Sequence, residues 1–208
     1  MKLEKITLYH LRMPLISHFE TSFGRIFDRD SILITIYAEG LIGYGECVAD
    51  RDPGYAYETS GTAWHILTDF ILPTVQGKDV KTPADLRALM KPVKGHEMAK
   101  AGLEMALWDL LGKKEKKSLQ TLLGGTKPKV AVGVSVGLQD TPGDLLRAVE
   151  DYLKLGYHRV KLKIKPGRDV GDVRVIRAAF PELKLQVDAN SAYTLQTAEA
   201  LQPLDDLD

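Results

Sequence analysis

The stretch that decides the fold is HRVKLKIK, residues 158–165, in which three lysines alternate with apolar residues. Side chains of a strand alternate between its two faces, so Lys161, Lys163 and Lys165 share one face, with about 6.5 Å between neighbours. Lysine is uncommon in strands, and three like charges on one face repel one another. Two explanations are open: an edge strand whose lysines block aggregation, or a site that needs a cation with a lowered pKa.

Strand and helix patterns alternate on both sides of this stretch. Strands are predicted at 129–137 (KVAVGVSVG) and 183–190 (LKLQVDAN), and helices at 141–156, 168–180 and 194–204. Thr141 and Pro142 form the start signal of the first of these helices. Alternation of this kind predicts a parallel sheet of three βα units.

Two parallel architectures fit such a sheet. A Rossmann sheet carries a glycine-rich phosphate turn after its first strand, and SVGLQDTPGD (135–144) lacks GxGxxG. A (β/α)₈ barrel instead carries functional groups at the ends of several strands, as Ser135, the lysines and Asp188 do here. Such a barrel needs eight strands and about 250 residues. We therefore expect residues 126–208 to be the start of a C-terminal barrel, and the chain to be an N-terminal fragment.

The first half of the chain, residues 1–125, is expected to form a separate α+β domain. Strands at 3–15, 31–40 and 41–49 predict a small antiparallel meander, and a long aromatic-bearing loop is expected at 16–30. Loops of this length are often functional.

Helices are expected to follow the meander. The first covers 58–75 and stops near Pro73, and the second covers 82–90 with Thr82 as its N-cap. The third, at 96–112, ends at Gly112. Its periodicity predicts a core stripe of Met98, Ala101, Met105, Trp108 and Leu111.

The composition excludes several classes of protein. The 208 residues are 44% hydrophobic and 27% charged with a formal net charge of +0, which gives no reason to expect nucleic acid or a membrane as partner. A single cysteine, Cys47, excludes an internal disulfide and is expected to be a small buried side chain. No signal peptide or membrane-spanning run is apparent. We therefore expect a cytoplasmic protein.

Asp188 and the lysines carry the chemistry. A carboxylate directly after an apolar strand, followed by Asn190, suits a hard cation at a barrel mouth, although it also suits a helix cap. A lysine that acts as a base must lose its proton, which nearby positive charge and burial promote. The lysine face taken alone suits a solvated face, but Asp188 one βα unit later favours a site. Lys165, beside Pro166 and Gly167, is expected to be a solvated rim residue without a specific role.

Together these residues indicate one reaction class. Removal of a proton α to a carboxylate creates a doubly negative enediolate, which a metal ion stabilises while a lysine takes the proton. The enolase superfamily is the general example of a lysine or histidine base used with Mg²⁺.

The chain resembles the muconate-lactonizing-enzyme subgroup of the enolase superfamily along its whole length. Residues 98–113 followed by LLGG (122–125) are similar to the connection between cap and barrel in that subgroup. VKLKIKPG (160–167) is similar to its K-x-K strand, and VDAN (187–190) to its first metal-ligand strand. Within the subgroup, the closest resemblance is to o-succinylbenzoate synthases and N-acylamino acid (N-succinylamino acid) racemases. The segments that carry this resemblance are MPL (13–15), FETSFG (19–24), GECVA (45–49), 57–73 and GVSVG (133–137).

The resemblance implies a capping domain over a modified barrel, with the loops at 19–24 and 47–55 closing over a small carboxylate substrate. It implies that Lys163 is the acid/base and that Lys161 supports the carboxylate charge and lowers the pKa of Lys163. Asp188 would be the first Mg²⁺ ligand.

Further substrate contacts are implied for Ser135, near the acyl or succinyl end, and for Phe19 and Phe23. Three departures, His18, Lys116 and Ser118, concern loop detail.

The resemblance leaves three outcomes open. The enzyme is expected to be an o-succinylbenzoate synthase of menaquinone biosynthesis, an N-succinylamino acid racemase, or both, and a homo-oligomer when full-length. A dipeptide epimerase or a muconate-type cycloisomerase is the enzymatic alternative. The alternative of another class is a truncated, non-catalytic fragment or assembly module, because an incomplete barrel lacks the remaining metal ligands and the opposite-face lysine.

Overall fold

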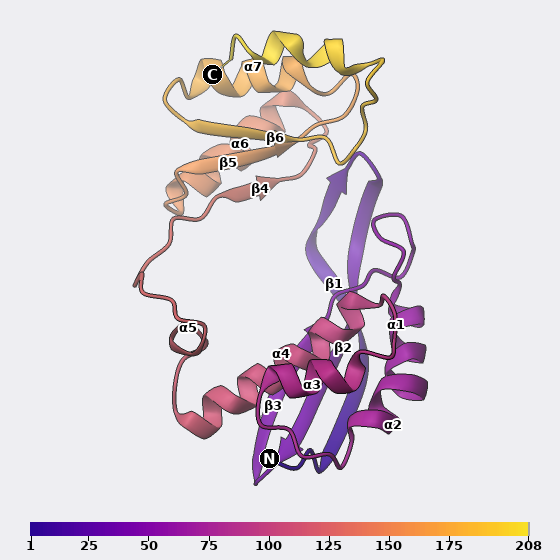
Figure 1. Ribbon diagram of the computed structural model, residues 1–208. Coiled ribbons are helices and arrows are strands. Elements are labelled where there is room, and N and C mark those ends of the chain that lie inside the picture. Colours follow the sequence, from indigo (N-terminus) through magenta and orange to yellow (C-terminus); the bar gives the residue numbers. More distant parts are fainter. Residues whose placement is uncertain (208) are drawn as a thin grey trace. The chain divides into compact units, whose positions relative to one another are not determined.

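The computed structural model describes residues 1–207, which form two compact units (Figure 1). The first unit comprises residues 1–14 and 28–128. The second comprises residues 15–27 and the chain from Lys129 onward. The predicted domain boundary between residues 125 and 126 stays a prediction. Among the described residues, no helix combines the length and apolar character needed to cross a membrane.

An antiparallel meander begins the chain, as the sequence predicts. Its strands run in the order β1 (Lys5–Thr21), β2 (Gly24–Ala38) and β3 (Leu41–Cys47). The turn between β2 and β3 places Glu39 and Gly40 at φ of 52° and 74°. Positive φ at both central residues is the geometry that suits a two-residue hairpin turn.

The predicted loop at 16–30 is wrong, because these residues continue β1 and β2 as a long hairpin (Figure 1). Only the turn around Ser22 and Phe23 interrupts the two strands. Charged and aromatic residues hide the period-2 pattern here. The backbone groups of each strand can be satisfied by the other strand without a buried face.

The helix predicted at 58–75 is confirmed and ends at Val75, two residues beyond Pro73. It consists of α1 (Ser60–Ile66), a π-helical segment η1 (Leu67–Ile71) and α2 (Leu72–Val75). Proline has no N–H to donate, and here it stands in the first turn of α2 directly after the wider π-helical segment. The helical path therefore continues for two residues beyond it.

Side-chain caps define the next helices. Thr82 caps α3 (Pro83–Met90), as predicted, and the side chain of Asp85 completes a capping box with it. The N-terminus of α4 (Glu97–Glu115) is capped from a distance by Glu58, whose buried carboxylate accepts the backbone N–H groups of Met98 and Ala99 at 2.9 and 3.1 Å. A carboxylate at this position also suits the positive end of the helix dipole.

The predicted core stripe of α4 is confirmed at one end and wrong in its middle. Leu111 is buried in the core of the first unit, and Met98 packs against that core. Met105 is 44% exposed and Ala101 is exposed, and the buried face instead contains Ala99, Gly102, Leu103, Ala106, Leu107 and Leu110. Small residues decide this orientation. A Cβ at Gly43 or Gly45 of β3 would lie 2.1 Å from a carbonyl oxygen of α4, so the helix lies directly on the strand. The helix also ends beyond Gly112, at Lys116 in a left-handed conformation, and α5 (Leu119–Leu122) follows.

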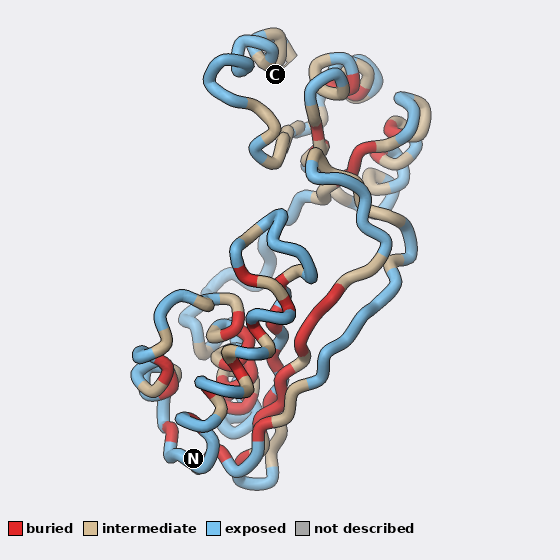
Figure 2. The backbone as a smooth tube through the Cα atoms, turned by 90° about the vertical axis from the view of Figure 1, so that its right-hand side faces the viewer, coloured by how far each residue is buried: buried red, intermediate tan, exposed pale blue. Residues whose placement is uncertain are grey.

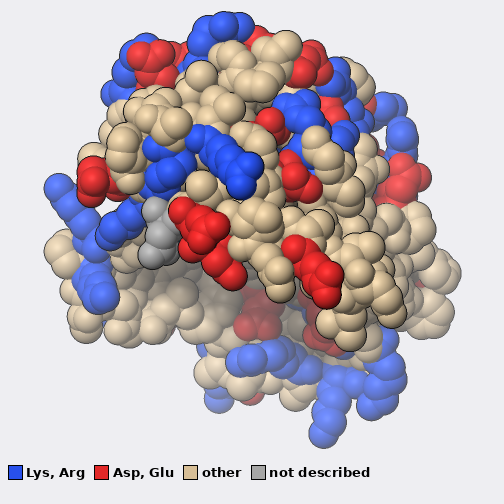
Figure 3. All heavy atoms as spheres, turned by 90° about the horizontal axis from the view of Figure 1, so that it is seen from above, with Lys and Arg blue, Asp and Glu red and all other residues tan. Residues whose placement is uncertain are grey.

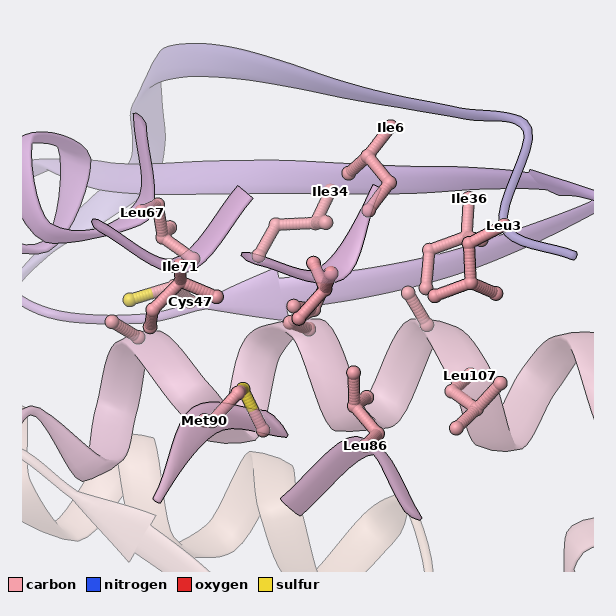
Figure 4. Close-up of a cluster of buried hydrophobic side chains, with 14 of the residues drawn as sticks. Leu3, Ile6, Ile34, Ile36, Cys47, Leu67, Ile71, Leu86, Met90 and Leu107 are labelled. Atoms are coloured by element: carbon pink, nitrogen blue, oxygen red, sulfur yellow. The ribbon is translucent and has the colours of Figure 1, made fainter. Parts of the chain in front are cut away.

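The core of the first unit fills the space between this sheet and its helices (Figure 4). The largest fully buried side chains come from both layers, among them Leu3, Ile34, Ile36, Leu67, Ile71, Leu86, Met90 and Leu107. Figure 2 shows that buried positions concentrate in these elements.

The second unit contains the predicted parallel sheet, in the order β4 (Val134–Val136), β5 (Arg159–Lys163) and β6 (Lys184–Asp188). Helices α6 (Pro142–Lys154) and α7 (Val170–Ala179) follow the first two strands. Two elements are shorter than predicted: β4 covers three residues, and the last helix is a 3₁₀ segment, η2 (Ala198–Leu204). Charges of both signs are mixed over the face seen in Figure 3, in line with the balanced composition.

Candidate active site

Strand β5 has one face in the hydrophobic core of the second unit and carries Lys161 and Lys163 on the other. Val160, Leu162 and Ile164 are at most 1% exposed and belong to the core of the second unit. The alternation of the strand therefore turns Lys161 and Lys163 to the opposite face, as predicted. The two lysines differ in environment, because the side chain of Lys163 is 8% exposed and that of Lys161 is 35% exposed.

Asp188 is the point where the two lysines meet. Its Oδ2 lies 2.8 Å from Nζ of Lys163 and 3.1 Å from Nζ of Lys161. The parallel register explains this contact, since Lys163 and Asp188 are direct partners on β5 and β6. The hydrogen bond from Lys163, then the backbone N–H of Asn190 and the hydrogen bond from Lys161, hold the pKa of Asp188 well below its usual range. The carboxylate is therefore ionised at neutral pH.

Asn190 completes this cluster through a contact with Lys163 that the sequence pattern does not predict. Its Oδ1 accepts a hydrogen bond from Lys163 Nζ at 2.7 Å, and its backbone N–H donates to Asp188 Oδ1 at 2.9 Å. Asn190 and Ser191 have φ of 47° and 62°, which bends the chain back beside the strand end. The helix-cap alternative for Asp188 is wrong, because the next described helical segment begins only at Ala198. The D-x-N spacing was the available signal for Asn190.

Ser135 lies on the same face of the sheet as Lys161, its direct partner on the neighbouring strand. Its Oγ is buried and has no hydrogen-bond partner among the described residues. An unpaired buried hydroxyl costs about 1–3 kcal/mol. This group is therefore a free donor and acceptor beside the lysines.

The two phenylalanines named from the sequence lie in different places. The ring centroid of Phe19 is 5.9 Å from Lys163 Nζ, within the range of a cation–π contact. Phe23 lies at the hairpin turn, and its side chain is 56% exposed. The substrate-binding role of both residues stays a prediction.

Two expectations for other residues have opposite outcomes. Cys47 is 1% exposed in the core of the first unit, so the expectation of a small buried side chain is confirmed, and burial raises the pKa of its thiol. Lys165 was expected to be a rim residue without a specific role. That expectation is wrong in one respect, because its Nζ lies 3.1 Å from Oε1 of Glu20.

The donor set at this cluster suits one ligand of a hard cation. The Asp188 carboxylate is an oxygen donor at a strand end, and Mg²⁺ favours one or two carboxylates together with water and substrate oxygens. Within residues 1–207, no group of three or more His, Cys, Asp or Glu side chains gathers in metal-binding geometry. Asp188 therefore fits as one Mg²⁺ ligand, and the described residues do not supply a full set of ligands.

Comparison with known proteins identifies the family of the chain. Residues 5–124 match the mandelate racemase / muconate lactonizing enzyme N-terminal domain, and residues 144–208 match the enolase C-terminal domain-like family. The chain is 45% identical over 98% of its length to an o-succinylbenzoate synthase of Geobacillus kaustophilus, covering 55% of that protein. It is also 45% identical over 100% of its length to an N-succinylamino acid racemase of Thermus thermophilus, covering 56%.

A crystal structure supports the same relationship. A member of the enolase superfamily from Listeria innocua superposes with a TM-score of 0.91 at 40% identity, with 100% of this chain and 56% of that chain covered. The chain thus spans about half the length of the relatives that it matches. These matches, together with the meander and the parallel sheet, show that the chain belongs to the mandelate racemase / muconate lactonizing enzyme family of the enolase superfamily.

Proposed function

We propose that this chain supplies the proton-transfer half of an active site that abstracts a proton α to a carboxylate, in an o-succinylbenzoate synthase, an N-succinylamino acid racemase, or an enzyme with both activities. The observation that carries the proposal is the convergence of Lys161 and Lys163 on Asp188 at the ends of β5 and β6. The relatives with these two names are equally similar to the chain. Both reactions begin with the same proton abstraction.

Lys163 is the proposed base. Its side chain is almost buried, and its Nζ is held by Asp188 and Asn190, so its position is defined before a substrate arrives. Lys161 is more exposed and lies beside the same carboxylate, where its charge can support a substrate carboxylate. Ser135 Oγ is the proposed donor to an acyl or succinyl oxygen, because no described residue uses it.

Mg²⁺ is the proposed cofactor, and Asp188 would be one of its ligands. When bound, the ion would stabilise the negative charge that develops on the substrate carboxylate. In this chain, the oxygen donor that suits the ion lies 2.8 Å from Nζ of Lys163 and 3.1 Å from Nζ of Lys161. A cytoplasmic location and homo-oligomeric assembly remain predictions from composition and family resemblance.

A chimera tests the proposal. The chain is continued after Asp208 with the corresponding part of the Geobacillus kaustophilus relative, and the unextended chain is assayed in parallel. With Mg²⁺ present, we expect the chimera to form o-succinylbenzoate, or to exchange the α-proton of N-succinyl amino acids in D₂O as followed by NMR. Lys163→Ala should abolish both reactions, whereas Lys184→Ala, at an exposed position on β6, should not.

Three results would count against the proposal. A Lys163→Ala chimera with full activity excludes Lys163 as the base. A folded chimera without either activity excludes the proposed reactions. Epimerisation of dipeptides or cycloisomerisation of muconate without these activities would favour the enzymatic alternatives.

A further inference from the structure

The tip of the β1–β2 hairpin, residues 15–27, belongs to the second unit although the sequence places it far from the barrel strands. We use the name hairpin tip for these residues. The Glu20 carbonyl accepts the backbone N–H of Leu138, just after β4, at 3.0 Å. Ser22 Oγ donates to the carbonyl of Ala189, just after β6, at 2.8 Å. The hairpin tip therefore touches the carboxyl ends of the first and third strands.

Gly137, just after β4, allows the close approach of the hairpin tip. A Cβ added at Gly137 would lie 3.2 Å from the backbone N and O of Glu20 and 3.2 Å from Cδ2 of Phe19. This separation is tighter than ordinary van der Waals contact, so the absence of a side chain lets the hairpin tip lie directly on the strand end. The same contact places Phe19 beside the sheet.

An ionic contact ties the hairpin tip to the end of β5. Oε1 of Glu20 lies 3.1 Å from Nζ of Lys165, and Oε2 accepts a hydrogen bond from Nε of Arg25 at 2.7 Å. Arg25 also contacts Asp140 at 2.7 Å. We call Glu20 with its two cationic partners, Lys165 and Arg25, the Glu20 clamp. The Glu20 side chain is 15% exposed, whereas its partners are 39% and 37% exposed, so the carboxylate is the enclosed member.

The side chain of Lys163 is almost buried where the hairpin tip lies against the sheet. Phe19 precedes Glu20 in the chain, and its ring lies 5.9 Å from Lys163 Nζ. Lys161, two residues before Lys163 on the same face, is about four times as exposed, at 35% against 8%. The side chain that approaches the more buried lysine thus comes from the segment that the Glu20 clamp fixes.

We propose that the Glu20 clamp is a latch that holds the hairpin tip on the ends of β4, β5 and β6 and keeps Phe19 over Lys163. Glu20 and Lys165 are positioning residues in this scheme, since neither contacts Lys163. By holding Phe19 in this place, the latch shields Nζ of Lys163 from solvent. The inference depends on the proposed function only in that Lys163 is called the base.

Competitive acetylation of lysines, read by mass spectrometry on the chain as it exists, tests the latch. In Lys165→Met, we expect the acetylation rate of Lys163 to rise about fourfold, toward the exposure that Lys161 already has. Lys165→Arg keeps the charge and should restore the slow rate. Lys100 of the first unit, whose side chain is 14% exposed, is the internal control and should not change.

Hydrogen exchange provides the second measurement. The backbone N–H groups of the hairpin tip and of Leu138 should exchange faster in Lys165→Met and in Glu20→Gln, while α4 keeps its protection. Unchanged labelling of Lys163 in both variants would overturn the proposal. So would an equal rise for Lys163 and Lys100, which would show general loosening. Neither measurement needs turnover, so an inactive enzyme would leave this test intact.

Discussion

Substitution of Gly45 tests how α4 is laid against the sheet. In Gly45→Ala, the new Cβ would lie 2.1 Å from the carbonyl oxygen of Gly102 and 2.5 Å from the backbone nitrogen of Ala106. Both atoms belong to helix backbone, so no side-chain rotation can relieve the contact. A separation of at least 3.0 Å requires the helix to move away by about 1 Å, against the close packing of the interior.

The expected loss of unfolding free energy follows from the core contacts that the movement of α4 would disturb. The helix carries Leu103, Leu107 and Leu110, all fully buried, into the core of the first unit. Overpacking of a core costs about 1–3 kcal/mol and occasionally more, and the backbone contact places this change at the upper end, about 3 kcal/mol. With a urea m-value of about 2 kcal/mol/M, the unfolding midpoint should fall by about 1.5 M.

Urea titration followed by tryptophan fluorescence is the assay, because Trp64 and Trp108 both lie in the first unit. Gly61→Ala is the matched control. Its Cβ would approach nothing closer than Thr59 Oγ1 at 3.7 Å, and alanine in a helix favours stability by up to about 1 kcal/mol. A Gly45→Ala midpoint equal to that of the wild type or of Gly61→Ala would refute the packing argument.

Three further predictions concern the second unit. Hydrogen bonds from Arg25 and Lys165 lower the pKa of Glu20 below its usual 4.5, so their contribution is present above pH 4.5 and is lost as the pH falls through the lower folded value. The difference in melting temperature between wild type and Glu20→Gln should therefore shrink to zero in acid, and a constant difference would contradict this. Thr141→Ala removes the N-cap of α6 and should cost about 1 kcal/mol in urea unfolding, whereas Thr141→Ser should cost little. Arg177→Met removes side-chain hydrogen bonds to the carbonyls of residues 181, 183 and 207 and should cost about 2 kcal/mol, with faster hydrogen exchange at 198–207; unchanged exchange there would exclude this role.

Features set by neighbouring residues could be predicted. The caps at Thr82 and Thr141, the turn at Glu39 and Gly40 and the alternation of strand and helix each depend on local backbone preferences. These were confirmed because a side-chain oxygen three residues from an N–H, or a glycine at a turn, acts within its own segment.

Features set by contact with another element could not be predicted so well. The stripe expected on α4 followed the large side chains, but Gly43 and Gly45 of β3 decide which face is buried by admitting the helix backbone. The sequence predicts a loop at 16–30, where the structure has a hairpin, because the polar and aromatic residues of this segment show no buried face. In both cases, the deciding neighbour lies elsewhere in the chain.

The candidate site shows the same division. The sequence by itself determined that Lys161 and Lys163 face one way and that a carboxylate follows one βα unit later, because strand parity is a local property. Only the tertiary structure decided that the register of β5 and β6 brings both ammonium groups to one oxygen of Asp188. It also decided that Lys165 has a partner, Glu20, which lies 145 positions away in the chain. Ion pairs act over a few ångströms, and the fold sets which charges come that close.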